Sequence, residues 1–119
     1  MKYQCDIPGF EDCFVELSER WTRGQLTKFF TVNGDEYLDL IRSKITAIHL
    51  TTEDGVIDTP EALTMEATDQ VDIWLWKWFG TAIAVGVDEL YSMGEAHARR
   101  WSGEYAKQTD ERRAKVKLN

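Results

Sequence analysis

Histidine and cysteine are scarce in this chain, which has two of each among its 119 residues. His49 and His97 lie far apart and have no other ligands at metal-binding spacing, so a Cys/His metal site is not expected. Cys5 and Cys13 follow no apolar leader-like segment, which favours a cytoplasmic location. In that reducing compartment the two cysteines are expected to be small buried thiols rather than a disulfide.

Positive charge is also in deficit, because 14 Lys and Arg face 21 Asp and Glu and the net charge is -7. Nucleic-acid-binding surfaces are usually basic, so nucleic acid is an unlikely partner. The imbalance is uneven: residues 94–119 hold seven basic and four acidic side chains, whereas residues 1–93 hold seven and seventeen. We therefore expect one domain over residues 1–93 and a basic, partly frayed C-terminal helix or tail over residues 94–119, with a basic arm formed by Arg99, Arg100, Arg112 and Arg113.

Motifs for nucleophilic catalysis, phosphate binding, zinc binding and dinucleotide binding are absent from the sequence. Glu53, Asp54 and Asp58 lack the ordered alternation of a calcium loop, and a solvated turn explains them better. His49 alternates with the apolar residues of its segment, which predicts a solvent-side position on a strand rather than a catalytic base. We expect no catalytic residue, no cofactor and no metal ion.

Local signals predict two β-hairpins and several helices. Pro8-Gly9 turns a first hairpin over residues 3–17, and Asp54-Gly55 turns a second over residues 45–57. Thr22 and Gln25 have the spacing of a capping box, which begins a helix that Asn33-Gly34 is expected to end. Further helix starts are predicted at Asp35, as a cap, and at Thr59-Pro60, with proline at the first helical position.

The most unusual segment is the apolar stretch from residue 71 to residue 93, which contains Trp74, Trp76 and Trp78. Lys77 and the flanking acids argue against a membrane span. The run is too long for one strand, and its few polar side chains form a narrow helical stripe, so we predict a long apolar central helix over about 68–93.

A helix that is apolar on two faces must be covered on both, either inside its own fold or by another subunit. The sequence leaves these two possibilities open. The predicted association surface is made of large apolar side chains: Ile73, Trp74, Trp76, Trp78, Ile83, Val87 and Leu90.

Together these signals predict an α+β fold, in which a small antiparallel sheet of two hairpins packs with three to five helices. The order of features resembles that of small tail-region proteins of long-tailed bacteriophages, among them tail assembly chaperones. The residues that carry the resemblance are Glu19 to Gly24, Tyr37 to Ile41 and Asp58 to Glu61, followed by the long apolar helix. The resemblance implies a non-enzymatic protein that binds the tape-measure protein through apolar surface and associates with itself.

The leading hypothesis is therefore a phage-type assembly or interaction protein of the host cytoplasm, with a tape-measure-like partner or a second copy of the chain. The alternative is an acidic anti-defence inhibitor that occupies a nucleic-acid-binding groove of a host enzyme, because seventeen acidic side chains over residues 1–93 can mimic phosphate charge. A small enzyme that uses carboxylates and a divalent metal is the weakest alternative.

Overall fold

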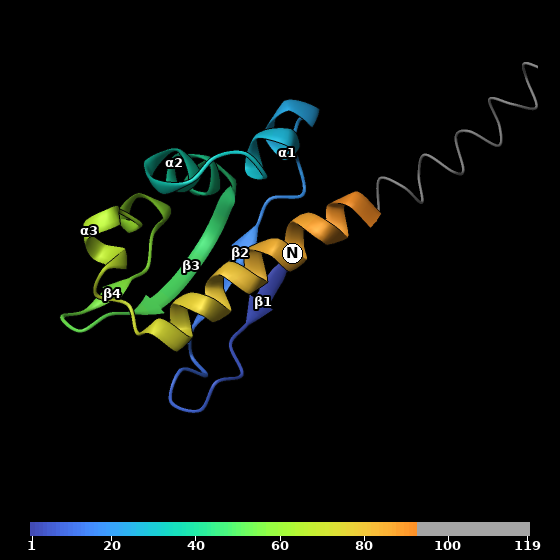
Figure 1. Ribbon diagram of the computed structural model, residues 1–119. Helices are drawn as coiled ribbons and strands as arrows, with labels where there is room; N and C mark the ends of the chain where they lie inside the picture. The colour runs from blue at the N-terminus through green and yellow to red at the C-terminus, as the bar shows by residue number, and fades with distance from the viewer. Residues whose placement is uncertain (93–119) are drawn as a thin grey trace, which may run out of the picture. The chain divides into compact units, whose positions relative to one another are not determined.

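The computed structural model describes residues 1–92, and its fold is α+β, as predicted (Figure 1). A compact unit spans Met1–Val87, and a second unit begins at Asp88. The elements follow one another in the order β1 (Lys2–Gln4), β2 (Phe14–Leu17), α1 (Arg23–Phe29), α2 (Gly34–Lys44), β3 (Ile45–Thr51), β4 (Val56–Ile57), the 3-10 helix η1 (Pro60–Ala62) and α3 (Met65–Thr68), and all of them except η1 are labelled in Figure 1. A further helix, called the 73–92 helix below, occupies residues 73–92.

The four strands form one antiparallel sheet in the order β1-β2-β3-β4. The two predicted hairpins are its two halves, and the β2–β3 pair joins them with a register shift between Glu16 and Leu17. Val15 pairs with Ile48, and Leu17 pairs with Ile45, so these buried side chains share the inner face of the sheet. The inner face therefore supplies one half of the core.

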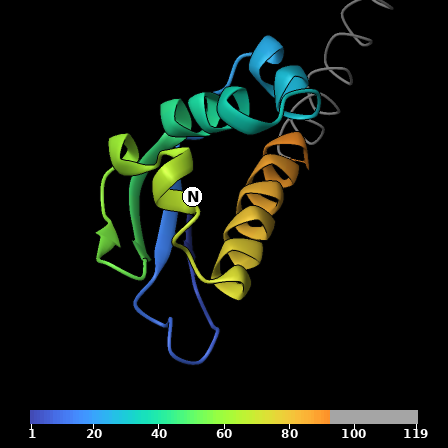
Figure 2. The ribbon, with the colours of Figure 1, turned by 60° about the vertical axis from the view of Figure 1, so that its left-hand side comes forward.

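The helices supply the other half of the core from one side of the sheet (Figure 2). Leu38 and Ile41 of α2 are buried together with Leu75, Phe79 and Ile83 of the 73–92 helix. The opposite face of the sheet is half-exposed and carries the Phe14–His49 pair. His49 stacks on Phe14 with ring centroids 6.4 Å apart, and its Nε2 lies 3.4 Å from a carboxylate oxygen of Asp12. Its predicted solvent-side position is confirmed.

Helix boundaries follow the caps. The predicted capping box is present, since the Gln25 amide donates to the Thr22 hydroxyl and the Thr22 amide donates to the Gln25 side chain. Thr59 caps η1 with Pro60 in its first turn, also as predicted. The prediction for the next boundary is wrong, because α1 ends at Phe29, and Asn33 is the N-cap of α2 rather than part of a stop signal.

The predicted start of the long helix at about residue 68 does not match the structure, in which α3 ends at Thr68 and a turn separates it from the helix that begins at residue 73. The Asp72 carboxylate accepts hydrogen bonds from the amides of Trp74 at 2.9 Å and Leu75 at 3.4 Å. An N-terminal cap of this kind satisfies amides that have no partner within the helix. Asp72 therefore defines where the helix begins.

At Gly86 the 73–92 helix packs directly against side chains of the sheet. A Cβ atom at this position would lie 2.6 Å from Cδ1 of Leu17 on β2 and 3.3 Å from the Tyr3 ring on β1. Leu17 is 1% exposed and has little room to move aside. A Cβ atom on Gly80 of the same helix would meet nothing within 4 Å. Gly86 and Gly80 therefore provide a test position and a control position for an added Cβ atom in the same helix.

We predict that Gly86→Ala lowers the melting temperature, because overpacking costs about 1–3 kcal/mol and outweighs the gain in helix propensity. Gly80→Ala is the control and is expected to stabilise the fold by up to about 1 kcal/mol, since only the propensity changes. Thermal unfolding followed by circular dichroism measures both variants. Equal stabilisation by the two substitutions would show that the helix is not pressed against Leu17.

Candidate interaction surface

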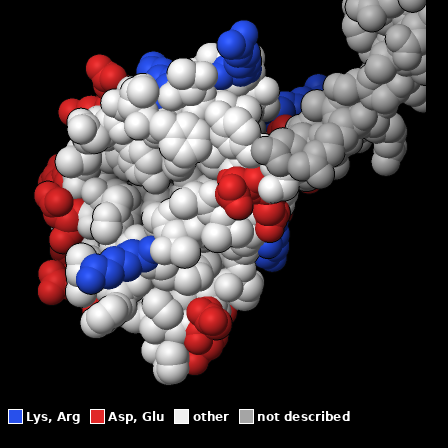
Figure 3. Space-filling view, turned by 45° about the vertical axis from the view of Figure 1, so that its right-hand side comes forward, with Lys and Arg blue, Asp and Glu red and all other residues white. Residues whose placement is uncertain are grey.

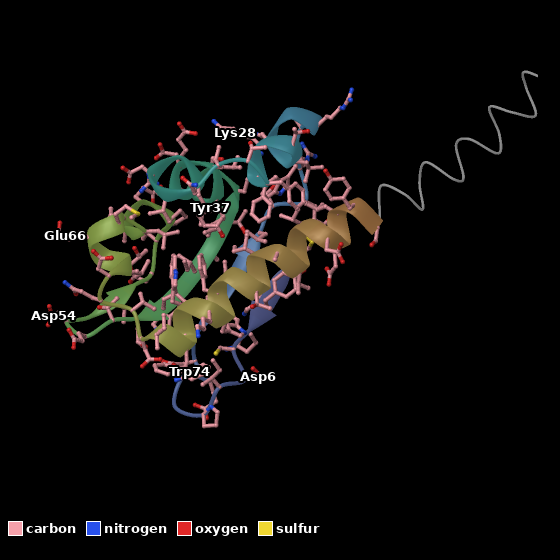
Figure 4. The ribbon with its side chains drawn as sticks, viewed as in Figure 1. Asp6, Lys28, Tyr37, Asp54, Glu66 and Trp74 are labelled. Carbon is pink, nitrogen blue, oxygen red and sulfur yellow. The ribbon has the colours of Figure 1, made fainter. Side chains whose placement is uncertain are left out.

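The first turn of the 73–92 helix presents large apolar side chains to solvent. Ile73 is 58% exposed and Trp74 is 64% exposed. The Lys77 ammonium lies 4.9 Å from the centre of the Trp74 ring, one helical turn further on. Figure 4 shows Trp74 at the end of the helix where it begins. A tryptophan exposed to this extent is unusual in a folded domain and marks a candidate contact surface.

The remaining predicted association residues divide between half-buried and buried positions. Trp76, Trp78 and Leu90 are half-buried, and the Trp76 ring stacks on Phe79 with centroids 5.2 Å apart. Ile83 and Val87 are 0% and 1% exposed, so they belong to the interior and form no part of an accessible surface. The predicted set is corrected by removing these two residues from the accessible surface, because the apolar pattern did not distinguish the face that packs inward from the face that does not.

Arg99, Arg100, Arg112 and Arg113, the predicted basic arm, lie outside the described residues, as does the predicted tail over residues 94–119.

Beside Ile73 the surface is hollowed into a groove of about 380 Å³ between α2, α3 and the start of the 73–92 helix. We call it the α2–α3 groove. Its volume falls in the range of about 300–1,000 Å³ that is common for binding pockets. Met65, on its rim, is 45% exposed, and Ile73 belongs both to the groove and to the exposed turn. The residues that line it are Gly34, Tyr37, Leu38, Met65, Thr68, Asp69, Val71, Ile73 and Trp76.

Sequence reasoning missed most of this groove. It identified Ile73 and Trp76 as association residues, but nothing in the sequence connected α2 with α3. The two elements are separated in sequence by β3 and β4, and only the fold brings them together. The available signal was the helical spacing of Gly34, Tyr37 and Leu38, which puts these residues on one face of α2.

Tyr37 is a titratable residue of the groove whose pKa is shifted by its surroundings. Burial raises the pKa of its phenol to about 12 from an ordinary value of 10.0. Its ring packs at a tilt against Phe29, with centroids 5.8 Å apart, and Phe29 in turn makes edge contacts with Trp21 and Phe30. Tyr37, labelled in Figure 4, thus connects the groove to an aromatic cluster formed by Trp21, Phe29 and Phe30.

Negative charge is concentrated in the segment that builds two walls of the groove. Residues 35–72 contain ten acidic and two basic side chains, whereas residues 1–34 contain five and four. Both basic side chains have partners: Arg42 contacts Asp39 and donates to the Leu63 carbonyl at 2.7 Å, and Lys44 donates to the Arg20 carbonyl at 2.8 Å. In Figure 3 a broad uncharged area occupies the middle of the visible face, with acidic side chains along its left edge.

We predict that Tyr37→Phe changes how stability depends on pH in the alkaline range. The raised pKa means that the folded state favours the neutral phenol, a contribution that is complete below pH 10 and lost as the pH rises towards 12. The wild-type protein should therefore lose more unfolding free energy between these values than Tyr37→Phe does. Urea unfolding at a series of pH values measures the difference, and parallel curves would contradict burial of the phenol.

Within residues 1–92, no helix combines the length and apolar character that crossing a bilayer requires. The same residues contain no group of three or more His, Cys, Asp or Glu side chains arranged to hold a metal ion. Comparison with known protein families, curated proteins and solved structures finds no match to this chain.

Proposed function

We propose that the protein is a non-enzymatic interaction protein that binds an apolar segment of a partner protein at the first turn of the 73–92 helix and the adjoining α2–α3 groove. The observation that carries the proposal is the 64% exposure of Trp74, which follows Ile73, an exposed residue that lines an apolar groove of about 380 Å³. Exposed tryptophans beside pockets are frequent energetic centres of protein interfaces. The function is therefore shielding of an apolar surface rather than chemistry.

The narrower form of the proposal is a phage tail assembly chaperone-like protein acting in the host cytoplasm. It is supported by the pattern resemblance described above and by the apolar character of the proposed surface. Cys5 and Cys13 are free thiols, which suits a reducing compartment. The partner in this form is a tape-measure-like protein, with a second copy of the chain as a further contact.

Photo-crosslinking tests the proposal at single-residue resolution. Trp74 is replaced by benzoylphenylalanine, in the full chain and in the cells that naturally produce it, and adducts are identified by mass spectrometry. We expect one dominant protein adduct, because a side chain that is 64% exposed in the first turn of the helix is within reach of a partner that covers this turn.

The matched control places the same photoreactive residue at Val56 on β4, which is 48% exposed but does not line the groove. The control should give none of the dominant adduct. Absence of any adduct from position 74, or the same adducts from both positions, would refute the proposal. An adduct between two copies of the chain would identify self-association as the function of this surface.

The acidic inhibitor is the second candidate, and the observation that favours it is the concentration of ten acidic side chains within residues 35–72. Acidic surfaces that replace nucleic acid act through charge, so their binding weakens steeply with salt. In this case the crosslinked partner would be a nucleic-acid-binding enzyme. Binding of that enzyme to the full chain, measured without crosslinking, would be lost at high ionic strength and would persist when Trp74 is replaced by serine.

A further inference from the structure

The α2–α3 groove combines apolar walls with carboxylates that have no ion-pair partner. Asp69 lines the groove, and Asp35 follows Gly34, the lining residue at the start of α2. Both side chains are exposed. Within the part of the chain that the structure describes, neither carboxylate takes part in an ion pair. No Lys or Arg is among the described residues that line the groove.

This combination selects among possible occupants. The apolar walls gain free energy when they are covered by an apolar side chain. An acidic segment would be repelled by residues 35–72, whose ten acidic side chains face only two basic ones, each already engaged. A cationic segment is attracted by the same field and meets Asp69 in the lining of the groove and Asp35 in the first turn of α2.

We infer that the groove binds a segment of the partner protein in which bulky apolar side chains are flanked by Lys or Arg. The inference rests on the proposed function and adds the chemistry of the partner to it. The apolar side chains enter the groove between Tyr37, Met65 and Ile73, and the flanking cations pair with Asp35 and Asp69. Apolar contact supplies affinity, while charge pairing at the rim selects the sign of the partner and raises its association rate.

Three fluorescent helical peptides of equal length test the partner chemistry by fluorescence anisotropy with the full chain. One is built from Leu and Lys, the second from Leu and Glu, and the third from Ser and Lys. We expect the Leu/Lys peptide to bind about tenfold more tightly than either of the others. It alone can make apolar contact with the walls of the groove and pair with the carboxylates. Equal binding of the two Lys peptides, or of the two Leu peptides, would overturn the inference.

Charge reversal locates the binding. The double variant Asp35→Lys with Asp69→Lys should lose about tenfold in affinity for the Leu/Lys peptide and gain affinity for the Leu/Glu peptide. The control Asp6→Lys with Glu19→Lys changes the net charge by the same amount at exposed residues outside the acidic segment 35–72 and outside the lining of the groove. Circular dichroism melting establishes that both variants are folded. An equal loss in the control would mean that overall charge, not the groove, attracts the peptide.

The outcomes separate the inference from the proposed function. If crosslinking at position 74 captures a partner whose binding is unaffected by reversal of Asp35 and Asp69, the interaction surface stands and its cationic selectivity is wrong. Sedimentation velocity of the full chain tests whether the groove is instead occupied by a second copy of the chain. If the chain assembles alone and the reversed variant does not, the groove holds a second copy, and the inference of a cationic partner protein is overturned.

Discussion

One contact organises the described part of the molecule: the inward face of the 73–92 helix packs on the inner face of the sheet. Leu75, Phe79 and Ile83 are each fully buried, and Gly86 lets the helix approach the Leu17 side chain. Because this packing determines which side chains of the helix point inward, it also determines which side chains point outward. The exposure of Ile73 and Trp74 follows from the packing and needs no separate cause. The candidate surface is thus the reverse side of the core.

The fold class and several boundaries could be predicted because their signals are local. A capping box places both partners, Thr22 and Gln25, within one turn, and hairpin turns lie between the strands that they connect. The beginning of the long helix was harder, since Thr68, Asp69 and Asp72 are all residue types that can cap a helix and all lie near the start of the apolar stretch. When a helix carries apolar side chains on every face, its own sequence does not show which face packs against the core.

The candidate site was predictable only in part for a different reason. Ile73 and Trp74 were identified from their own segment, whereas Ile83 and Val87 proved to be interior. The groove is formed by residues that are brought together by tertiary packing, such as Tyr37 and Met65. No periodicity within either segment encodes that neighbourhood. The clustering of acidic residues over 35–72, in contrast, is visible in the sequence, although its position beside an apolar groove is not.

The junction between α2 and β3 has a mechanical consequence. α2 ends at Lys44 and β3 begins at Ile45, so no loop separates the helix from the strand. The wall of the groove that carries Tyr37 is therefore attached directly to an interior strand of the sheet. The opposite wall, α3, is a single turn of helix joined to its neighbours by short irregular segments. If the groove widens on binding, α3 would therefore move, whereas α2 would stay in place relative to the sheet.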